Sequence, residues 1–210
     1  MKMNLANRVT ITRILLLVPF TICMLQINDT AYSESARNIF RYASLALFLT
    51  MAASDGLDGY LARKKGQVTK LGAFLDPMAD KLLMMCACLL LASKTGSIDG
   101  FRLPPAVAVL IIGKDMFLLM GFITVFFLTT EVHVVPEKIG KYATVLQLTM
   151  VSAILIAPEM SNVIPSWIWF LRILWWTAAS TAIIATLIYI RTGTRYIETF
   201  DNSAEKTRKP

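Results

Sequence analysis

The sequence predicts an all-α, polytopic membrane protein with six transmembrane helices, and three observations support this fold class. The chain of 210 residues is 56% apolar and only 17% charged, with a mean hydropathy of +0.59, which is too apolar for a soluble domain of this size. The apolar residues form runs along the whole chain instead of a single anchor. The net charge is +7, and the Lys and Arg residues lie mostly at the ends of these runs. This position favours binding to anionic lipid headgroups and not to nucleic acid.

The first predicted helix, Leu5–Leu25, has basic residues at its start and could pass for a signal peptide. No small-x-small cleavage site follows it, so we expect an uncleaved helix. Asn7, Thr10 and Arg13 repeat every third residue along one side of this helix. Such a stripe suits either the polar, cytosolic end of a helix or the border of a binding site.

The second and third helices are predicted to contain four aspartates. The second helix covers Ile39–Ala62, and the basic loop Lys64–Lys70 leads into the third. The clean apolar runs on either side, Ala43–Ser54 and Leu82–Ala92, are each too short for the roughly 30 Å hydrocarbon core, which takes about 20 helical residues. The crossing helices must therefore include the aspartates.

The aspartates are spaced so that they share helix faces. Asp55 and Asp58 lie three residues apart, and Asp76 and Asp80 lie four apart, so each helix presents a ridge of carboxylates. Isolated carboxylates in hydrocarbon are costly, and four close together repel one another or take up protons. Carboxylates that face one another around divalent cations avoid both costs. Oxygen-only ligands of this kind suit Mg²⁺ or Mn²⁺ and not zinc.

Small residues and one arginine beside the aspartates indicate what the metal ions would hold. Gly59 and Ala62 have almost no side chain, so a phosphate-bearing group could approach the backbone, and Arg63 offers a forked cation suited to diphosphate. We therefore interpret the segment as a diphosphate–metal site. The alternatives are helices whose charged ends simply emerge into water, and a small cation transporter, whose carboxylates would be spread along several helices.

These residues form one pattern, Asp55-x-x-Asp58-Gly59-x-x-Ala62-Arg63, then eight residues, then Gly72-x-x-x-Asp76-x-x-x-Asp80. The pattern resembles the signature of the CDP-alcohol phosphatidyltransferase family, with every fixed position filled. The resemblance implies an enzyme of six membrane helices that displaces CMP from a CDP-linked alcohol, using two Mg²⁺ (or Mn²⁺) ions. Its active site would lie at the cytoplasmic ends of helices two and three.

The resemblance also implies roles by position. Asp55, Asp58 and Asp76 would be metal ligands, and Asp80 would be both a metal ligand and the catalytic general base. The Asn-x-x-Thr-x-x-Arg stripe is similar to the first-helix pattern of the family. The residues implied to bind the CDP part of the donor are Asn7, Thr10, Gly59, Ala62, Arg63 and Gly72.

Three further helices are predicted at Pro104–Leu128, Gly140–Ala157 and Ser166–Ile190. They complete a membrane domain over residues 1–191, and a polar, basic C-terminal tail covers residues 192–210. With the N-terminus inside, the cytoplasmic ends and loops contain 14 Lys or Arg residues, whereas the other side contains four, Arg37, Arg41, Lys94 and Arg102. This bias predicts that both termini are cytoplasmic, in the plasma membrane of a bacterium.

Charges inside the fourth helix need a separate explanation. Asp115 could neutralise Lys114 locally. Alternatively, Lys114 forms a cationic pocket with Lys141 and Arg191, which would bind an acceptor alcohol that carries its own phosphate. The sequence leaves both interpretations open.

The acceptor itself is indicated by resemblance. The string FLDPMADKLL around Asp76 and the Gly140–Lys141 pair look like phosphatidylglycerophosphate synthases, which use glycerol 3-phosphate. The Lys114–Asp115 helix and the segment Thr144–Pro158 are similar to eukaryotic-type cardiolipin synthases, which use phosphatidylglycerol. We expect transfer of the phosphatidyl group of CDP-diacylglycerol to glycerol 3-phosphate, with cardiolipin synthesis as the alternative. The expected partners are these substrates and membrane lipids, and a homodimer is compatible with the sequence.

Overall fold

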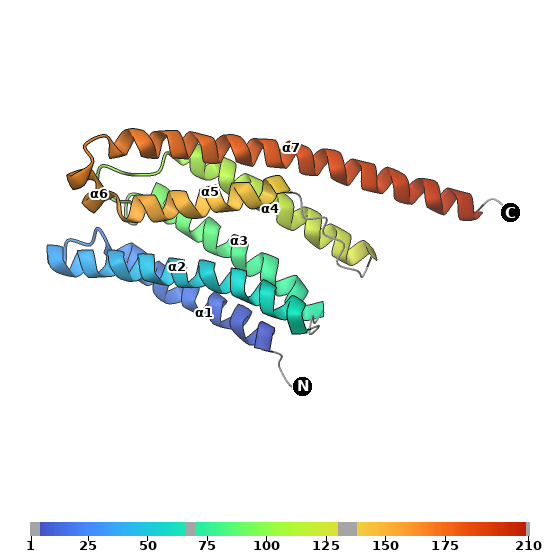
Figure 1. The fold of residues 1–210 in the computed structure, drawn as a ribbon, viewed down its shortest axis with the longest axis horizontal. Coiled ribbons are helices and arrows are strands. Elements are labelled where there is room, and N and C mark those ends of the chain that lie inside the picture. Colours follow the sequence, from blue (N-terminus) through green and yellow to red (C-terminus); the bar gives the residue numbers. More distant parts are fainter. Residues whose placement is uncertain (1–4, 66–69, 130–137, 209–210) are drawn as a thin grey trace.

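The computed structural model describes the backbone of residues 5–65, 70–129 and 138–208, and the side chains of residues 9–54, 78–121, 123–124 and 140–192. Within these ranges the chain forms helices and no strand, which confirms the all-α prediction. The helices run side by side along one long axis (Figure 1). They are α1 (Leu5–Gln26), α2 (Glu34–Lys65), α3 (Lys70–Ala92), α4 (Pro105–Thr129), α5 (Lys138–Leu155), α6 (Ala157–Val163) and α7 (Trp167–Arg208).

Helix α2 begins at Glu34, earlier than the predicted start at Ile39. Ser33 takes the N-cap position, where its Oγ accepts a hydrogen bond from the backbone N–H of Ala36 at 3.3 Å. Glu34 adds a negative charge in the first turn, which favours the positive end of the helix dipole. These local signals extend the helix into a stretch that hydropathy alone treats as a polar break.

The predicted helix Gly140–Ala157 is divided into two. Helix α5 ends at Leu155, and α6 turns away from it by 73°. Pro158 lies in the first turn of α6, where its missing N–H costs no hydrogen bond. In a continuous helix its ring would instead clash with the carbonyl group four residues earlier.

The last helix is longer than predicted. Helix α7 continues without a break from Trp167 to Arg208, so the predicted C-terminal tail is an extension of this helix up to Arg208. It projects beyond the rest of the bundle (Figure 1).

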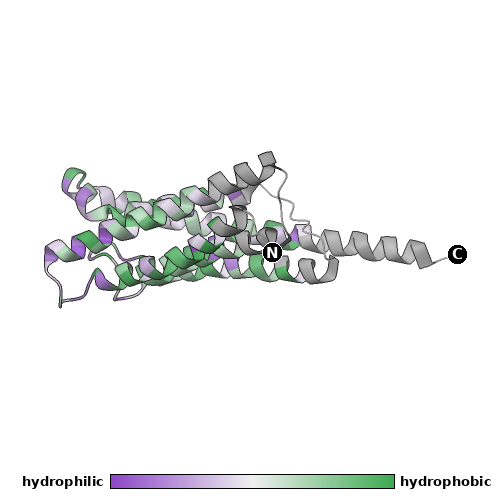
Figure 2. Cartoon of the chain, turned by 90° about the horizontal axis from the view of Figure 1, so that it is seen from below, coloured by the Kyte–Doolittle hydropathy of each residue, from purple (hydrophilic) through white to green (hydrophobic). Residues whose placement is uncertain are grey.

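Hydrophobic residues predominate along the described helices (Figure 2), and they occupy the outer faces of the bundle as well as its core. The core contains fully buried side chains such as Phe20, Phe48, Leu83, Ile111 and Ile154. Large apolar residues such as Leu15, Leu89, Val109, Met120 and Leu187 are exposed on the outer faces, as expected of helices surrounded by lipid. Among the described residues, α1 and α7 are long and apolar enough to cross a membrane, and the bent pair α5–α6 would be a third span.

Helix α3 lies at the centre of the helix packing. It contacts α1, α2, α4 and α5, whereas α7 packs on α4, α5 and α6. A side chain on α3 can therefore meet residues from four other helices. Asp80 lies on this central helix, and its side chain is 21% exposed.

Candidate functional site

The four predicted metal-binding aspartates are divided between two helices in contact. Asp55 and Asp58 lie near the C-terminal end of α2, and Asp76 and Asp80 lie in the first half of α3, which packs on α2. Of these four side chains, only that of Asp80 is described. The others lie outside the described side chains, as do the predicted donor contacts Asn7, Gly59, Ala62, Arg63 and Gly72. No cluster of three metal-ligating side chains occurs among those described, so the metal site stays a prediction.

The polar stripe of α1 packs against α2 beside the aspartate segment. Thr10 is fully buried and Arg13 is 2% exposed. Arg13 Nε donates a hydrogen bond to Ser54 Oγ at 3.4 Å, and Ser54 immediately precedes Asp55. These two residues therefore border the predicted site and do not form a solvated helix end, whereas donor binding by Thr10 stays a prediction.

Asp80 stands at one end of a chain of charged contacts. Lys81 Nζ lies 3.5 Å from Asp80 Oδ2 and 3.1 Å from Asp115 Oδ1. Lys114 Nζ lies 3.0 Å from the same Asp115 oxygen and donates a hydrogen bond to Gln147 Oε1 at 3.2 Å. We call Lys81, Lys114, Asp115 and Gln147 the buried charge cluster. It joins α3, α4 and α5.

The buried charge cluster lies deep in the bundle. Asp115 and Gln147 are fully buried, and Lys114 is 3% exposed. Lys81 and Lys114 stand 11 and nine residues after the first residues of their helices, about 16 Å and 14 Å along the axis. Ionised groups at such depth are costly unless they are paired, and they usually mark a functional region.

Sequence analysis identified part of this cluster. Local neutralisation of Lys114 by Asp115 is one of the two interpretations that the sequence leaves open, and the structure contains this ion pair. The contact between Lys81 and Asp115 and the contribution of Gln147 were missed. One signal was available for Gln147, because it is a polar residue within an otherwise apolar stretch of α5, but helical periodicity does not say which residue of another helix it meets.

The other two cations predicted for the acceptor lie elsewhere. Lys141 and Arg191 are both exposed. Lys141 precedes Gln147 by six residues, about 9 Å along α5 and on a different helix face, so it does not join the buried charge cluster. A Cβ atom at Gly140 would collide with the Tyr189 hydroxyl group. This close approach places Lys141 and Arg191 in the same region of the α5–α7 contact.

A second polar network ties the start of α2 to the α5–α6 junction. The Arg41 guanidinium pairs with both carboxylate oxygens of Glu159 and donates to the carbonyl oxygen of Leu155 at 3.0 Å and to Asn38 Oδ1 at 3.1 Å. Because this network lies at the end of α2 opposite Asp55 and Asp58, it serves the structure and not the site.

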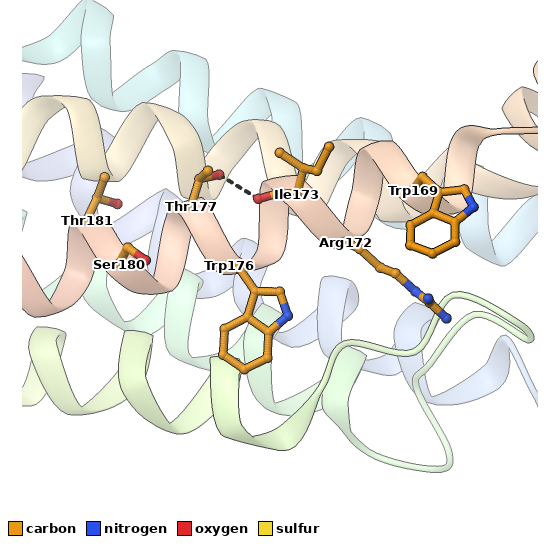
Figure 3. Close-up of a pocket in the computed structure, with 7 residues that line it drawn as sticks. All are labelled: Trp169, Arg172, Ile173, Trp176, Thr177, Ser180 and Thr181. Atoms are coloured by element: carbon orange, nitrogen blue, oxygen red, sulfur yellow. Dashed lines mark hydrogen bonds between the residues drawn. The ribbon is translucent and has the colours of Figure 1, made fainter.

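A shallow groove follows the outer face of α7 between Trp169 and Thr181 (Figure 3). The Arg172 guanidinium lies over the Trp169 ring, 4.8 Å from its centroid, and the Thr177 hydroxyl donates to the carbonyl oxygen of Ile173 at 2.9 Å. The groove contains no carboxylate, and α7 does not pack on α3. It is therefore separate from Asp80, and its exposed aromatic and apolar side chains suit contact with lipid.

Comparison with known proteins adds independent findings. A family model described as CDP-alcohol phosphatidyltransferase matches residues 3–185. The chain is 38% identical over 156 residues to a protein of Bacillus subtilis (strain 168), which covers 73% of this chain and 77% of that protein. It is 32% identical over 197 residues to a protein of Rickettsia bellii (strain RML369-C), with 92% and 97% covered. Both relatives are named CDP-diacylglycerol--glycerol-3-phosphate 3-phosphatidyltransferase.

A relative with a different name also matches. A protein of Oryza sativa subsp. japonica that is named cardiolipin synthase (CMP-forming) is 32% identical over 162 residues. The alignment covers 71% of this chain and 47% of that protein. The two acceptor classes considered from the sequence are therefore both represented among the relatives.

Proposed function

The chain belongs to the CDP-alcohol phosphatidyltransferase family, and we propose that it transfers the phosphatidyl group of CDP-diacylglycerol to glycerol 3-phosphate and releases CMP. One observation carries the choice of reaction. The two relatives that align over 73% and 92% of this chain are both named for it. The rice relative supports cardiolipin synthesis, with phosphatidylglycerol as the acceptor, as the second candidate.

The proposed metal ligands are Asp55, Asp58, Asp76 and Asp80, which would hold two Mg²⁺ or Mn²⁺ ions. The set fits these ions because it is made of carboxylate oxygens alone and comes from two helices that pack together. When bound, the ions would supply charge stabilisation for the diphosphate and the departing CMP. The CDP part of the donor is proposed to meet Asn7, Thr10, Gly59, Ala62, Arg63 and Gly72.

Asp80 is the proposed general base. Its side chain is 21% exposed, so it can reach an incoming hydroxyl group while it also contacts Lys81. As the acceptor oxygen forms its bond to the β-phosphorus of CDP-diacylglycerol, the bond from that phosphorus to CMP breaks, and the hydroxyl proton passes to the Asp80 carboxylate. Arg63 would bind the diphosphate as charge moves toward CMP.

The proposed acceptor site uses Lys114, Lys141 and Arg191. The latter two are exposed in one region of the α5–α7 contact. Lys114 lies deeper, in a connected set of two lysines (Lys81 and Lys114) and two carboxylates (Asp80 and Asp115) that has no net charge. The excess of positive charge therefore comes from the exposed Lys141 and Arg191. A local excess of positive charge favours an acceptor that carries a phosphate.

The proposed topology has six crossing helices, α1 to α5 and α7, in the bacterial plasma membrane. Both termini and the aspartates of α2 and α3 would be on the cytoplasmic side. The support for this orientation is the excess of Lys and Arg on that side.

The test of the reaction is CMP release by the purified protein in detergent with CDP-diacylglycerol, Mg²⁺ and one acceptor at a time. We expect release with glycerol 3-phosphate, and the variant Asp55→Asn serves as the inactive control. Release with phosphatidylglycerol alone would replace the proposal by its second candidate. No release with either acceptor, or with inositol or serine, would overturn phosphatidyl transfer altogether.

A further inference from the structure

The buried charge cluster is arranged in a way that stability alone does not explain. Two ammonium groups share one oxygen of Asp115. Asp115 Oδ2 and Gln147 Nε2 are buried and make no hydrogen bond within the described part of the chain. Buried ion pairs rarely stabilise a protein more than apolar residues of similar size would, and unpaired buried polar atoms are unfavourable. Such an arrangement indicates a role beyond folding.

The position of Lys81 shows what that role involves. Its ammonium group lies between two carboxylates and is closer to Asp115, at 3.1 Å, than to Asp80, at 3.5 Å. Asp115 is itself fixed, because it is fully buried and contacts Lys114. Gln147 fixes Lys114 in turn from α5. Two neighbouring helices therefore determine where the flexible Lys81 side chain of α3 ends.

Without Asp115, Lys81 would have one close carboxylate left. An unpaired ammonium group inside an apolar bundle is costly, so it moves to the nearest anion. Asp80 is already within 3.5 Å. A close Lys81–Asp80 ion pair would occupy carboxylate oxygens that the transfer reaction needs.

We propose that Asp115 is a positioning residue, which holds the Lys81 ammonium group partly away from Asp80 and so keeps the Asp80 carboxylate oriented and accessible. The inference rests on the proposed function, because that function gives Asp80 its place at the reacting hydroxyl group. Asp115 acts through Lys81 and does not touch the substrate. Lys81 contributes a weaker effect, since its longer contact orients Asp80 without capturing it.

The first variant for the test is Asp115→Asn, which removes the anchor and leaves Asp80 in place. We expect kcat with glycerol 3-phosphate to fall on the order of 10- to 100-fold, the size of effect that a misplaced catalytic group produces. The KM for CDP-diacylglycerol should change by less than about twofold, because the donor site is not altered.

The double variant Lys81→Met/Asp115→Asn separates positioning from folding. A structural cluster predicts that losing a second member lowers kcat further. The positioning role predicts the reverse, because the lysine that captures Asp80 is gone. We expect kcat of the double variant to match that of Lys81→Met alone. It should also exceed kcat of Asp115→Asn by roughly tenfold, so that the double variant recovers part of the activity lost in Asp115→Asn. A double variant no more active than Asp115→Asn would overturn the proposal.

A readout without catalysis accompanies the kinetics. We expect the rise of the thermal unfolding midpoint on adding Mg²⁺ to be smaller in Asp115→Asn than in the wild type, and to return in the double variant. Glu159→Gln is the matched control, since it breaks an ion pair at the opposite end of α2. It should lower the midpoint and leave kcat unchanged. A similar loss of kcat in Glu159→Gln would show that any broken ion pair has this effect and would overturn the inference.

Two further comparisons keep the result interpretable. If Asp115→Asn does not fold, Asp115→Glu replaces it, because the longer side chain keeps the charge but moves the carboxylate. Its kcat should fall, and an unchanged kcat would contradict the proposal. Wild-type activity is measured in the same series. If the wild type shows no activity with any acceptor, the proposed function is wrong. If the wild type is active but the variants do not rank in kcat as expected, this inference is wrong.

Discussion

Asp80 is the proposed metal ligand whose side-chain surroundings the structure describes. Its carboxylate is partly exposed on one side and touches Lys81 on the other, which is what a base needs if it is to meet a substrate and keep its orientation. Spacing alone placed Asp80 one helical turn from Asp76. The spacing did not show that Lys81, beside Asp80, would also contact Asp115 of α4. A pattern along one helix does not indicate which of its residues a second helix contacts.

Asp80→Asn tests the general-base role. The amide has almost the same shape as the carboxylate but cannot take up the acceptor proton, so we expect turnover to fall on the order of 10²- to 10⁴-fold while CDP-diacylglycerol still binds. CMP release and equilibrium binding of the donor measure the two effects separately. Asp99→Asn is the control, because Asp99 is exposed in the loop between α3 and α4, and it should keep wild-type turnover. Normal turnover in Asp80→Asn would exclude the general-base role.

At the scale of the elements, the sequence predicted which segments are helical but not all of their ends. Apolar runs located α1 and α4 closely, and the run Leu82–Ala92 located the end of α3. The start of α2 depends on the Ser33 cap and the end of α5 on Pro158, both of which act over a few residues and escape a hydropathy pattern. The aspartate spacing placed the predicted ligands on two helices that do pack together. The contact between Lys81 and Asp115 depends on how α3 packs on α4. Helical periodicity does not predict this packing.

The close approach of α5 and α7 leads to a prediction for Gly140. In Gly140→Ala the new Cβ would collide with the Tyr189 hydroxyl group. Either the Tyr189 side chain or one of the two helices must shift, and we expect a loss of about 1 kcal/mol of stability. Because Lys141 is the next residue, the KM for glycerol 3-phosphate should rise more than that for CDP-diacylglycerol. Thermal unfolding and initial-rate kinetics measure both effects.

Two variants serve as controls for Gly140→Ala. Gly113→Ala adds a Cβ on α4 where no heavy atom lies within 4 Å, so it should be neutral or slightly stabilising. Adding Tyr189→Phe to Gly140→Ala removes the colliding oxygen and leaves the ring carbon at 3.5 Å, an ordinary contact. The double variant should recover the acceptor KM. If the KM values of Gly140→Ala and Gly113→Ala are the same, the α5–α7 contact does not position the acceptor site.

At the scale of the whole molecule, polar networks at two levels of the bundle have different tasks. The Arg41–Glu159 network joins α2 to the α5–α6 junction, at the end of α2 opposite Asp55 and Asp58. The buried charge cluster lies about halfway along α3 and ends at Asp80. An enzyme that joins a lipid-linked donor to a polar acceptor needs such an interior, because its reacting groups must meet below the membrane surface while the chain around them remains apolar enough for lipid.

The proposed orientation predicts which parts of the chain a reagent reaches from outside the cell. The background for this test has Cys23, Cys86 and Cys88 replaced by alanine. A new cysteine at Asp99, an exposed position in the α3–α4 loop, should react with a membrane-impermeant maleimide in intact cells whose outer membrane, if present, is permeabilised. A cysteine at Ser203, near the C-terminus, should react only after the plasma membrane is disrupted, because the excess of Lys and Arg retains that end in the cytoplasm. The reverse pattern would place the aspartates of α2 and α3 at the outer surface, where CDP-linked donors made in the cytoplasm could not reach them.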